Sequence, residues 1–167
     1  MSTFIVEGGH KLNGSISCQG AKNEALEVIC AVLLSDAPVT ISNIPDISDV
    51  RNLIGMLRDM GVKVEFTSHD TCRFTADNID ISYIYTEEFL KKACSLRGSV
   101  MIIGPLVARF GKAILPKPGG DKIGRRRLDT HFLGLQKLGA DFEYVQEHKI
   151  YKIDAPKGLT GTYMLLD

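Results

Sequence analysis

The stretch LRDMGVKVE at residues 57–65 recurs in the second half of the chain as LQKLGADFE at residues 135–143. Each copy has an apolar helical end, then a glycine, then residues that alternate between apolar and polar. A glycine directly after a helix is a common helix stop, and alternation is typical of a half-buried strand. The two copies start 78 positions apart, so the sequence predicts one structural unit that occurs twice.

Upstream of this stretch the two units align at a shorter offset of 74 positions. The aligned pairs are Ile29 with Ile103, Leu33 with Val107, Val39 with Ala113, and Ile41 with Leu115. The second unit therefore carries four extra residues between Leu115 and Leu135. Binding and catalytic residues often lie on loops that a rigid scaffold holds in place, so this interval is the place to look for function.

Apolar periodicity and breakers predict a mixed α/β chain in which helices cover one side of small sheets. The expected helices span about 21–34, 48–60, 86–109 and 128–138, with a break in the third near Gly104. The expected strands are 4–7, 14–18, 39–42, 62–66, 72–75, 112–115, 141–145, 149–153 and 162–166.

The composition narrows the class of protein. Hydrophobic residues make up 44% of the 167 residues and charged residues 24%, which predicts a folded core. Lys plus Arg and Asp plus Glu both total 20, and this balance argues against binding to nucleic acid or a membrane surface. The first ten residues lack a basic segment followed by an apolar run, which favours a cytoplasmic protein. No histidine or cysteine spacing indicates a metal site.

The interval with the extra residues holds LPKPGGDKIGRRRLDTH, residues 115–131. Its prolines and glycines exclude regular structure from Pro116 to Gly124 and predict a flap that can close over a ligand. Asp121 lies at the tip of this flap, where it is either an ordinary turn residue or a functional acid.

Three arginines, Arg125 to Arg127, precede the expected helix at 128–138. A helix N-terminus offers free N–H groups, and guanidinium groups beside it make a site for phosphate or carboxylate. The alternative is a solvated basic turn that Asp129 balances.

A second polar cluster, GAKNE at residues 20–24, opens the first expected helix. Lys22 and Asn23 fall in its first turn, and the offset of 74 places Asn23 opposite Arg97. Arg97 interrupts an apolar run, and an unpaired buried charge is costly. Arg97 therefore either lies at the rim of a helix with its stem buried, or shares one cleft with the equivalent position of the first unit.

Several of these motifs together resemble those of the enolpyruvyl transferases. They are GAKN at 20–23, RGS at 97–99, GPLVARFG at 104–111, the stretch 115–131, and GLQKLGA at 134–140. The GAKN opening is similar to the branch that acts on UDP-N-acetylglucosamine and differs from the shikimate-pathway branch.

The resemblance implies an inside-out α/β barrel domain built from repeated βαβαββ units, here truncated. Family members are longer and have a second domain, so the chain is expected to be an N-terminal fragment. Residues 1–20 would form strands that pack with the missing C-terminal domain. Residues 21–167 would hold two repeats and the incomplete start of a third.

The resemblance also implies an activity. The family transfers the enolpyruvyl group of phosphoenolpyruvate to the 3′-hydroxyl of UDP-N-acetylglucosamine and releases phosphate, without a cofactor. This is the first committed step of peptidoglycan synthesis, and we expect the fragment alone to be inactive. A non-catalytic anion- or nucleotide-binding module that uses Arg125 to Arg127, and a pure scaffold, are the alternatives.

The motif positions imply a role for each site residue. Asp121 would be the proton donor, and Lys22 and Asn23 would contact phosphoenolpyruvate. The residues implied for the phosphate and UDP-sugar side are Arg97, Arg126, Arg127, Leu128, Asp129 and Thr130. Most members have Cys where this chain has Asp121, which predicts insensitivity to the epoxide antibiotic fosfomycin. Many have Pro at the position of Arg127.

Overall fold

The structure, a computed structural model, describes residues 3–117 and 128–165. The first unit consists of α1 (Lys22–Ala31), the 3-10 turn η1 (Val32–Leu34), β1 (Val39–Ile41), α2 (Ser48–Asp59), β2 (Lys63–Phe66) and β3 (Cys72–Thr75). A 3-10 segment, η2 (Ile81–Tyr85), leads into the second unit. That unit consists of α3 (Glu87–Ser95), η3 (Arg97–Ile102), α4 (Ile103–Phe110), β4 (Lys112–Pro116), α5 (Asp129–Lys137), β5 (Asp141–Val145) and β6 (Ile150–Asp154).

The two units have the same sheet topology. Each forms a three-stranded antiparallel sheet, with strand order β1-β3-β2 in the first and β4-β6-β5 in the second. The registers correspond as well, since Val39 pairs with Phe74 and its repeat partner Ala113 pairs with Ile153. The predicted repeat is therefore confirmed.

Both helix stops use the predicted glycines. Gly61 has a φ of 103° and donates its N–H to the carbonyl of Arg58 at 2.9 Å. Gly139 has a φ of 95° and donates to Gln136 at 3.0 Å. Only glycine adopts this left-handed region at little cost, so the residue type fixes where α2 and α5 end.

The two glycines differ in what surrounds them, which predicts unequal effects of substitution. A Cβ on Gly61 would lie 2.4 Å from the backbone oxygen of Asn78, whereas one on Gly139 would lie 3.2 Å from the hydroxyl of Thr160. A side chain can move and a backbone carbonyl cannot. We expect Gly61→Ala to lower the free energy of unfolding by about 3 kcal/mol and Gly139→Ala by about 1 kcal/mol in urea denaturation. Equal losses would contradict this account.

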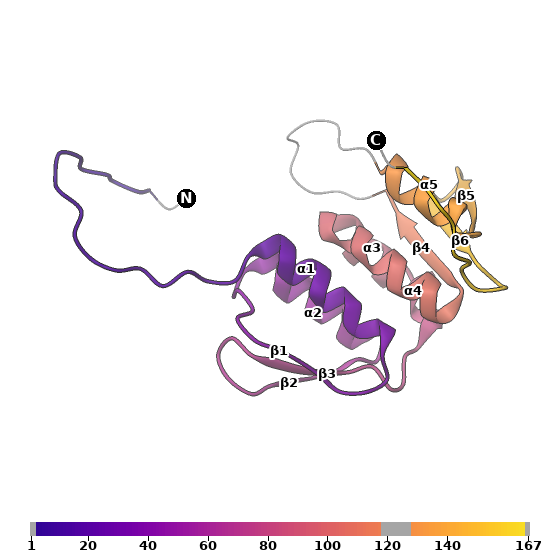
Figure 1. The fold of residues 1–167 in the computed structure, drawn as a ribbon, viewed down its shortest axis with the longest axis horizontal. Coiled ribbons are helices and arrows are strands. Elements are labelled where there is room, and N and C mark those ends of the chain that lie inside the picture. The colour runs from indigo at the N-terminus through magenta and orange to yellow at the C-terminus, as the bar shows by residue number, and fades with distance from the viewer. Residues whose placement is uncertain (1–2, 118–127, 166–167) are drawn as a thin grey trace.

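The helices α1 to α4 lie between the two sheets, and α5 packs on β5. Figure 1 shows α1 and α2 over the β1-β3-β2 sheet, and α3 and α4 between these helices and the second sheet. A single buried core runs through both units and includes Leu33, Leu53, Phe74, Phe89 and Leu106. The units therefore share one apolar interior.

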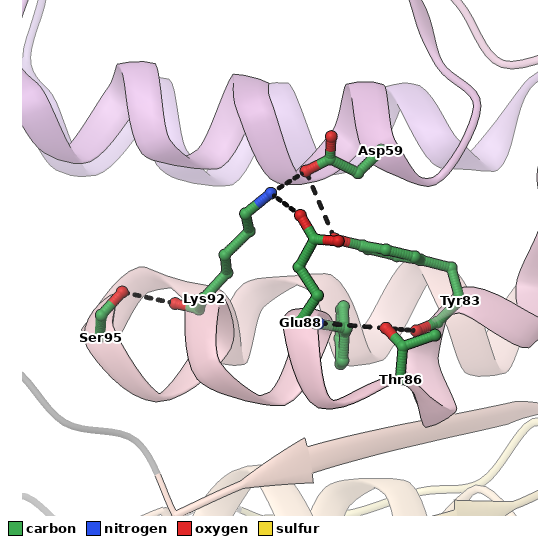
Figure 2. Close-up of polar contacts among 7 residues, drawn as sticks. Asp59, Tyr83, Thr86, Glu88, Lys92 and Ser95 are labelled. Atoms are coloured by element: carbon green, nitrogen blue, oxygen red, sulfur yellow. Dashed lines mark hydrogen bonds and ion pairs between the residues drawn. The ribbon is translucent and has the colours of Figure 1, made fainter.

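A polar cluster at the surface also joins the units. In Figure 2 the ammonium of Lys92 on α3 contacts Asp59 at the end of α2 and Glu88 one turn earlier, the latter at 2.6 Å. The Tyr83 hydroxyl donates to the same Asp59 carboxylate at 3.3 Å. Hydrogen bonds to Asp59 and Glu88 raise the pKa of Lys92 above its ordinary value. This cluster ties α2 to α3 from outside the core.

The predicted break in the third helical segment lies earlier than Gly104. Leu96 has extended backbone angles and separates α3 from η3, and the segments on its two sides are bent by 119°. The Ser99 hydroxyl donates to the carbonyl of Ala93 at 2.7 Å, which satisfies one of the carbonyls freed at the bend. Gly104 and Pro105 instead fall in the first turn of α4, where proline is tolerated.

Three expected strands are not present in the described residues. Residues 3–21 and 155–165 have no strand, and Figure 1 shows the first of these segments running away from the helices and sheets. Strands are stabilised by hydrogen bonds to a neighbour, and in the described part of the chain these segments pair with none of the six strands. The alternation at 4–7, 14–18 and 162–165 is real, but the strands predicted from it are wrong for this structure.

The buried thiol of Cys30 predicts a loss of stability at alkaline pH. Desolvation, with a smaller contribution from the charge of Glu27, raises its pKa from 9.0 to about 12. Between these values the unfolded chain releases a proton that the folded chain retains, so stability falls as pH rises. The difference in free energy of unfolding between the parent and Cys30→Ala should be constant below about pH 8. Between about pH 9 and 12 this difference should shrink, with a pH slope that corresponds to at most one proton. A constant difference would show that Cys30 does not titrate this way.

Candidate functional site

One pocket collects three of the predicted site residues. It has a volume of about 210 Å³ and lies between the start of α1, the first turn of α2 and η3. Its lining residues are Lys22, Asn23, Leu26, Glu27, Asp49, Arg97, Gly98, Val100 and Met101. The structure thus brings Lys22 and Asn23 of the first unit next to Arg97 of the second.

The backbone before α1 is held close to a neighbouring loop. A Cβ on Gly20 would lie 1.9 Å from the backbone oxygen of Asn43, so no larger residue fits without movement. The helix then begins at Lys22, and the residue before it, Ala21, has an extended backbone and no capping side chain. The N–H groups of the first turn and the Lys22 side chain are therefore at the same end of α1.

Arg97 opens η3 directly after the bend at Leu96. Its side chain is half-buried at the pocket, while Leu96 before it is buried. Gly98 after it packs on α1, since a Cβ there would lie 2.7 Å from the Cδ1 atom of Leu26. The bend and the small residue together place Arg97 at the rim of the pocket. Both sequence interpretations, a rim arginine and a shared cleft, describe this position.

The pocket contains two carboxylates that the sequence analysis did not identify. The Lys22 ammonium forms a 2.9 Å ion pair with Asp49 in the first turn of α2. Glu27 lines the same pocket one turn along α1 from Asn23. Among the described residues, the charged groups of its lining are thus two cations and two carboxylates. The amphipathic pattern of 48–60 predicted the helix that carries Asp49, but a contact across 27 residues is not visible in one sequence.

The other predicted site residues fall in or next to the glycine-rich stretch. Asp121, Arg126 and Arg127 lie outside the described residues. Leu128 is buried just before α5, while Asp129 and Thr130 are exposed in its first turn. The pocket lining described above does not include these three. Their roles stay predictions.

The start of the glycine-rich stretch lies close to the C-terminal end of α3. Its strand, β4, ends at Pro116, and the next carbonyl, that of Lys117, accepts a bond from the Cys94 thiol at 3.6 Å. Cys94 is in the last turn of α3, three residues before Arg97. The chain therefore enters the stretch beside the helix end that leads to Arg97.

Two further tests of the described residues give no site of another kind. Residues 3–117 and 128–165 contain no group of three or more His, Cys, Asp or Glu side chains that could hold a metal ion. No single helix in these ranges is long and apolar enough to cross a membrane. The bent pair of Glu87–Ser95 and Arg97–Phe110 meets the length and composition criteria only when taken together.

Comparison with known proteins defines the class of this chain. The family model of EPSP synthase (3-phosphoshikimate 1-carboxyvinyltransferase) matches residues 6–164. That match covers nearly the whole chain, so the chain belongs to this family of enolpyruvyl transferases, as the motifs predicted.

The sequences of individual relatives are closely similar to this chain. The chain is 62% identical over 167 residues to UDP-N-acetylglucosamine 1-carboxyvinyltransferase of Bacteroides fragilis. It is 58% identical to the protein of the same name in Porphyromonas gingivalis. Each match covers 100% of this chain and 38% of the relative, so the chain spans well under half of their length.

Solved structures agree on the fold. The enolpyruvyl transferase NikO from Streptomyces tendae matches 92% of this chain and 32% of its own chain, with a TM-score of 0.72 and 23% identity. EPSP synthase from Acinetobacter baumannii matches 89% of this chain and 33% of its own, with a TM-score of 0.57 and 14% identity. These likenesses confirm the predicted mixed α/β fold of the enolpyruvyl transferases.

Proposed function

We propose that this chain supplies the phosphoenolpyruvate-binding part of an active site that transfers the enolpyruvyl group to the 3′-hydroxyl of UDP-N-acetylglucosamine. The observation that carries the proposal is the pocket in which Lys22, Asn23 and Arg97 meet from equivalent places in two repeat units. The names of the Bacteroides and Porphyromonas relatives support the choice of acceptor. In the cell this reaction would begin peptidoglycan synthesis.

The side chains of the pocket suit phosphoenolpyruvate. Its phosphate and carboxylate need cationic donors, and the ammonium of Lys22 and the planar guanidinium of Arg97 supply them. The amide of Asn23 can donate one hydrogen bond and accept another, so it can contact either substrate. Charge that develops in the transition state is stabilised best by groups already fixed in place.

The reaction proceeds by addition and elimination. The 3′-hydroxyl oxygen forms a bond to C2 of phosphoenolpyruvate while C3 gains a proton, and the hydroxyl proton is lost to a base. The C2–O bond to phosphate then breaks and C3 gives up a proton, which leaves the enolpyruvyl ether and free phosphate. Asp121 would donate the proton to C3, and a positioned proton transfer contributes about 100- to 10,000-fold.

The remaining predicted residues would act on the other sides of the substrates. Arg97 would bind at the junction of the two substrates, and Arg126 would help to hold the phosphate. The run Arg126 to Thr130 would face the UDP-sugar. The burial of Leu128 and the exposure of Asp129 and Thr130 support this assignment, since one side chain anchors the run and two are accessible.

The N-terminal segment would pack on a second domain that completes the site. Its large apolar side chains are almost fully exposed, and exposed apolar surface of this kind marks an interaction site. These side chains are Phe4, Ile5, Val6, Leu12 and Ile16, each at least 87% exposed. We therefore expect the 167 residues to bind substrate without turning it over.

A chimera tests the proposal. Residues 1–167 replace the matching part of the Bacteroides fragilis relative, and phosphate release is measured with both substrates and with each omitted. We expect turnover that requires both substrates. Lys22→Met and Arg97→Met should each lower kcat/KM for phosphoenolpyruvate by at least about 100-fold.

Arg73 provides the matched control, because it is an exposed arginine on β3 that does not line the pocket. Arg73→Met should leave kcat/KM within about twofold. A folded chimera without turnover, or one whose rate is unaffected by Lys22→Met and Arg97→Met, would contradict the proposal.

A further inference from the structure

The Lys22–Asp49 ion pair lies inside the candidate site and belongs to two helices of the first unit. Asp49 Oδ2 is 2.9 Å from the Lys22 ammonium, and the side chains are 39% and 50% exposed. Exposed ion pairs of this kind contribute little to stability, because they are screened and cost side-chain entropy. The pair therefore invites a functional explanation rather than a structural one.

The explanation starts from the flexibility of lysine. A half-exposed lysine has many accessible rotamers, and a site that must order it on substrate binding loses affinity through the lost side-chain entropy. A partner that holds the ammonium beforehand removes this cost. The ammonium has three N–H donors, and the bond to Asp49 uses one of them, so donors remain for an anion.

We propose that Asp49 is a positioning residue, which holds the Lys22 ammonium at the pocket in the orientation that transfer of the enolpyruvyl group requires. The inference rests on the proposed function and adds a residue to it. Asp49 is placed for the task by the first turn of α2, where a negative charge is also favoured by the helix dipole. It acts through Lys22 and does not itself bond the substrate.

The proposal predicts a split between kinetic constants. Removing the Asp49 charge takes a negative group away from an anionic substrate, and this gain offsets the cost of ordering Lys22 on binding, so binding should not weaken. The loss of orientation should appear in the chemical step instead. In the chimera, Asp49→Asn should lower kcat by about 10- to 100-fold while KM for phosphoenolpyruvate stays the same or falls. Asp49→Glu, which keeps the charge, should recover most of the rate.

Asp46 is the matched control for loss of a carboxylate. It lies three residues before Asp49 and forms an ion pair with Arg51 at 2.5 Å, and it does not line the pocket. Asp46→Asn should leave both constants unchanged. A rate loss equal to that of Asp49→Asn would show a general effect of exposed ion pairs around α2 and would overturn the specific role of Asp49.

A double-mutant cycle separates positioning from a structural role. If Asp49 acts through Lys22, then Asp49→Asn should have no further effect on kcat once Lys22 is replaced by methionine. A second loss of the same size in the Lys22→Met background would overturn the proposal, because Asp49 would then act without Lys22.

A measurement on the 167-residue chain keeps the inference independent of turnover. Nitrogen-15 relaxation of the lysine ammonium groups should show an ordered Lys22 that becomes mobile in Asp49→Asn. Lys92, held by two carboxylates, is an ordered internal reference, and the exposed Lys157 is a mobile one.

The two experiments distinguish the two ideas. Unchanged order of Lys22 in Asp49→Asn would overturn the positioning role, whatever the chimera does. If Lys22 loses order in Asp49→Asn of the 167-residue chain but the chimera has no turnover, the proposed function is overturned and the positioning of Lys22 by Asp49 is retained.

Discussion

Replacing Arg109 by methionine should lower the free energy of unfolding of the chain by about 3 kcal/mol. One nitrogen of the Arg109 guanidinium, Nη1, lies within hydrogen-bond distance of three backbone carbonyls. They belong to Leu33 at 2.9 Å, Ser35 at 3.2 Å and Ala76 at 2.9 Å. Methionine fills the space of the stem without any donor, so these carbonyls would lose a charged partner in a partly buried place.

The size of this effect follows from where the carbonyls lie. Arg109 belongs to α4 of the second unit, and all three carbonyls belong to the first unit or its end. The Cζ atom of the guanidinium also lies 5.1 Å from the centroid of the Phe110 ring, which adds a cation–π contact. The Arg109 side chain thus joins the two repeat units at a point where the described strands of one unit do not pair with those of the other.

Urea denaturation measures the loss, with Arg73→Met as the control. Arg73 is exposed on β3, so its replacement should change the free energy of unfolding by less than about 0.5 kcal/mol. If Arg109→Met were equally mild, the hydrogen bonds of Arg109 would contribute little to holding the two units together.

The second large effect concerns the response to an epoxide. We expect the chimera with Asp121 to resist fosfomycin and the Asp121→Cys variant to be inactivated by it at least about 100-fold faster. A thiolate is a strong nucleophile towards the epoxide carbon, whereas a carboxylate is a weak one that can still carry a proton. The expectation rests on the family motif around residues 115–131, because Asp121 lies outside the described residues.

The control must account for other thiols. Cys94 is exposed at the end of α3 and its sulfur lies 3.6 Å from the carbonyl of Lys117, so it could react in its own right. The comparison is therefore repeated with Cys94→Ala in both proteins, and time-dependent loss of activity is followed. The chimera that keeps Asp121 sets the baseline, and resistance that persists in Asp121→Cys would refute the argument.

Local patterns in the sequence were sufficient for most of the regular structure. The periodicity of Leu53, Leu57 and their neighbours predicted α2, and Gly61 and Gly139 predicted where two helices end. The repeat predicted that the two sheets would correspond. These features depend on residues close in sequence, or on a comparison of the chain with itself.

Features set by distant contacts were not predictable in the same way. The bend at Leu96 depends on the packing of Ser99 and on the approach of Gly98 to α1. From the glycines and the proline of this segment, the sequence analysis instead placed the break near Gly104. The alternation at 4–7 does not indicate whether a partner strand is at hand, and pairing decides whether such a segment becomes a strand.

The candidate site shows the same division. The repeat offset placed Asn23 opposite Arg97, and the structure brings both to one pocket. The sequence did not reveal Asp49, because an ion pair between the first turns of two helices leaves no periodic signal.

The most direct test of the account is a titration of the isotope-labelled 167-residue chain with phosphoenolpyruvate, followed by nuclear magnetic resonance. We predict saturable changes at the Lys22 ammonium, the Asn23 amide and the Arg97 guanidinium with one common dissociation constant, lost in Arg97→Met. Changes confined to other surfaces, or changes at this pocket that any phosphate produces equally well, would contradict the claim that the pocket binds the enolpyruvyl donor.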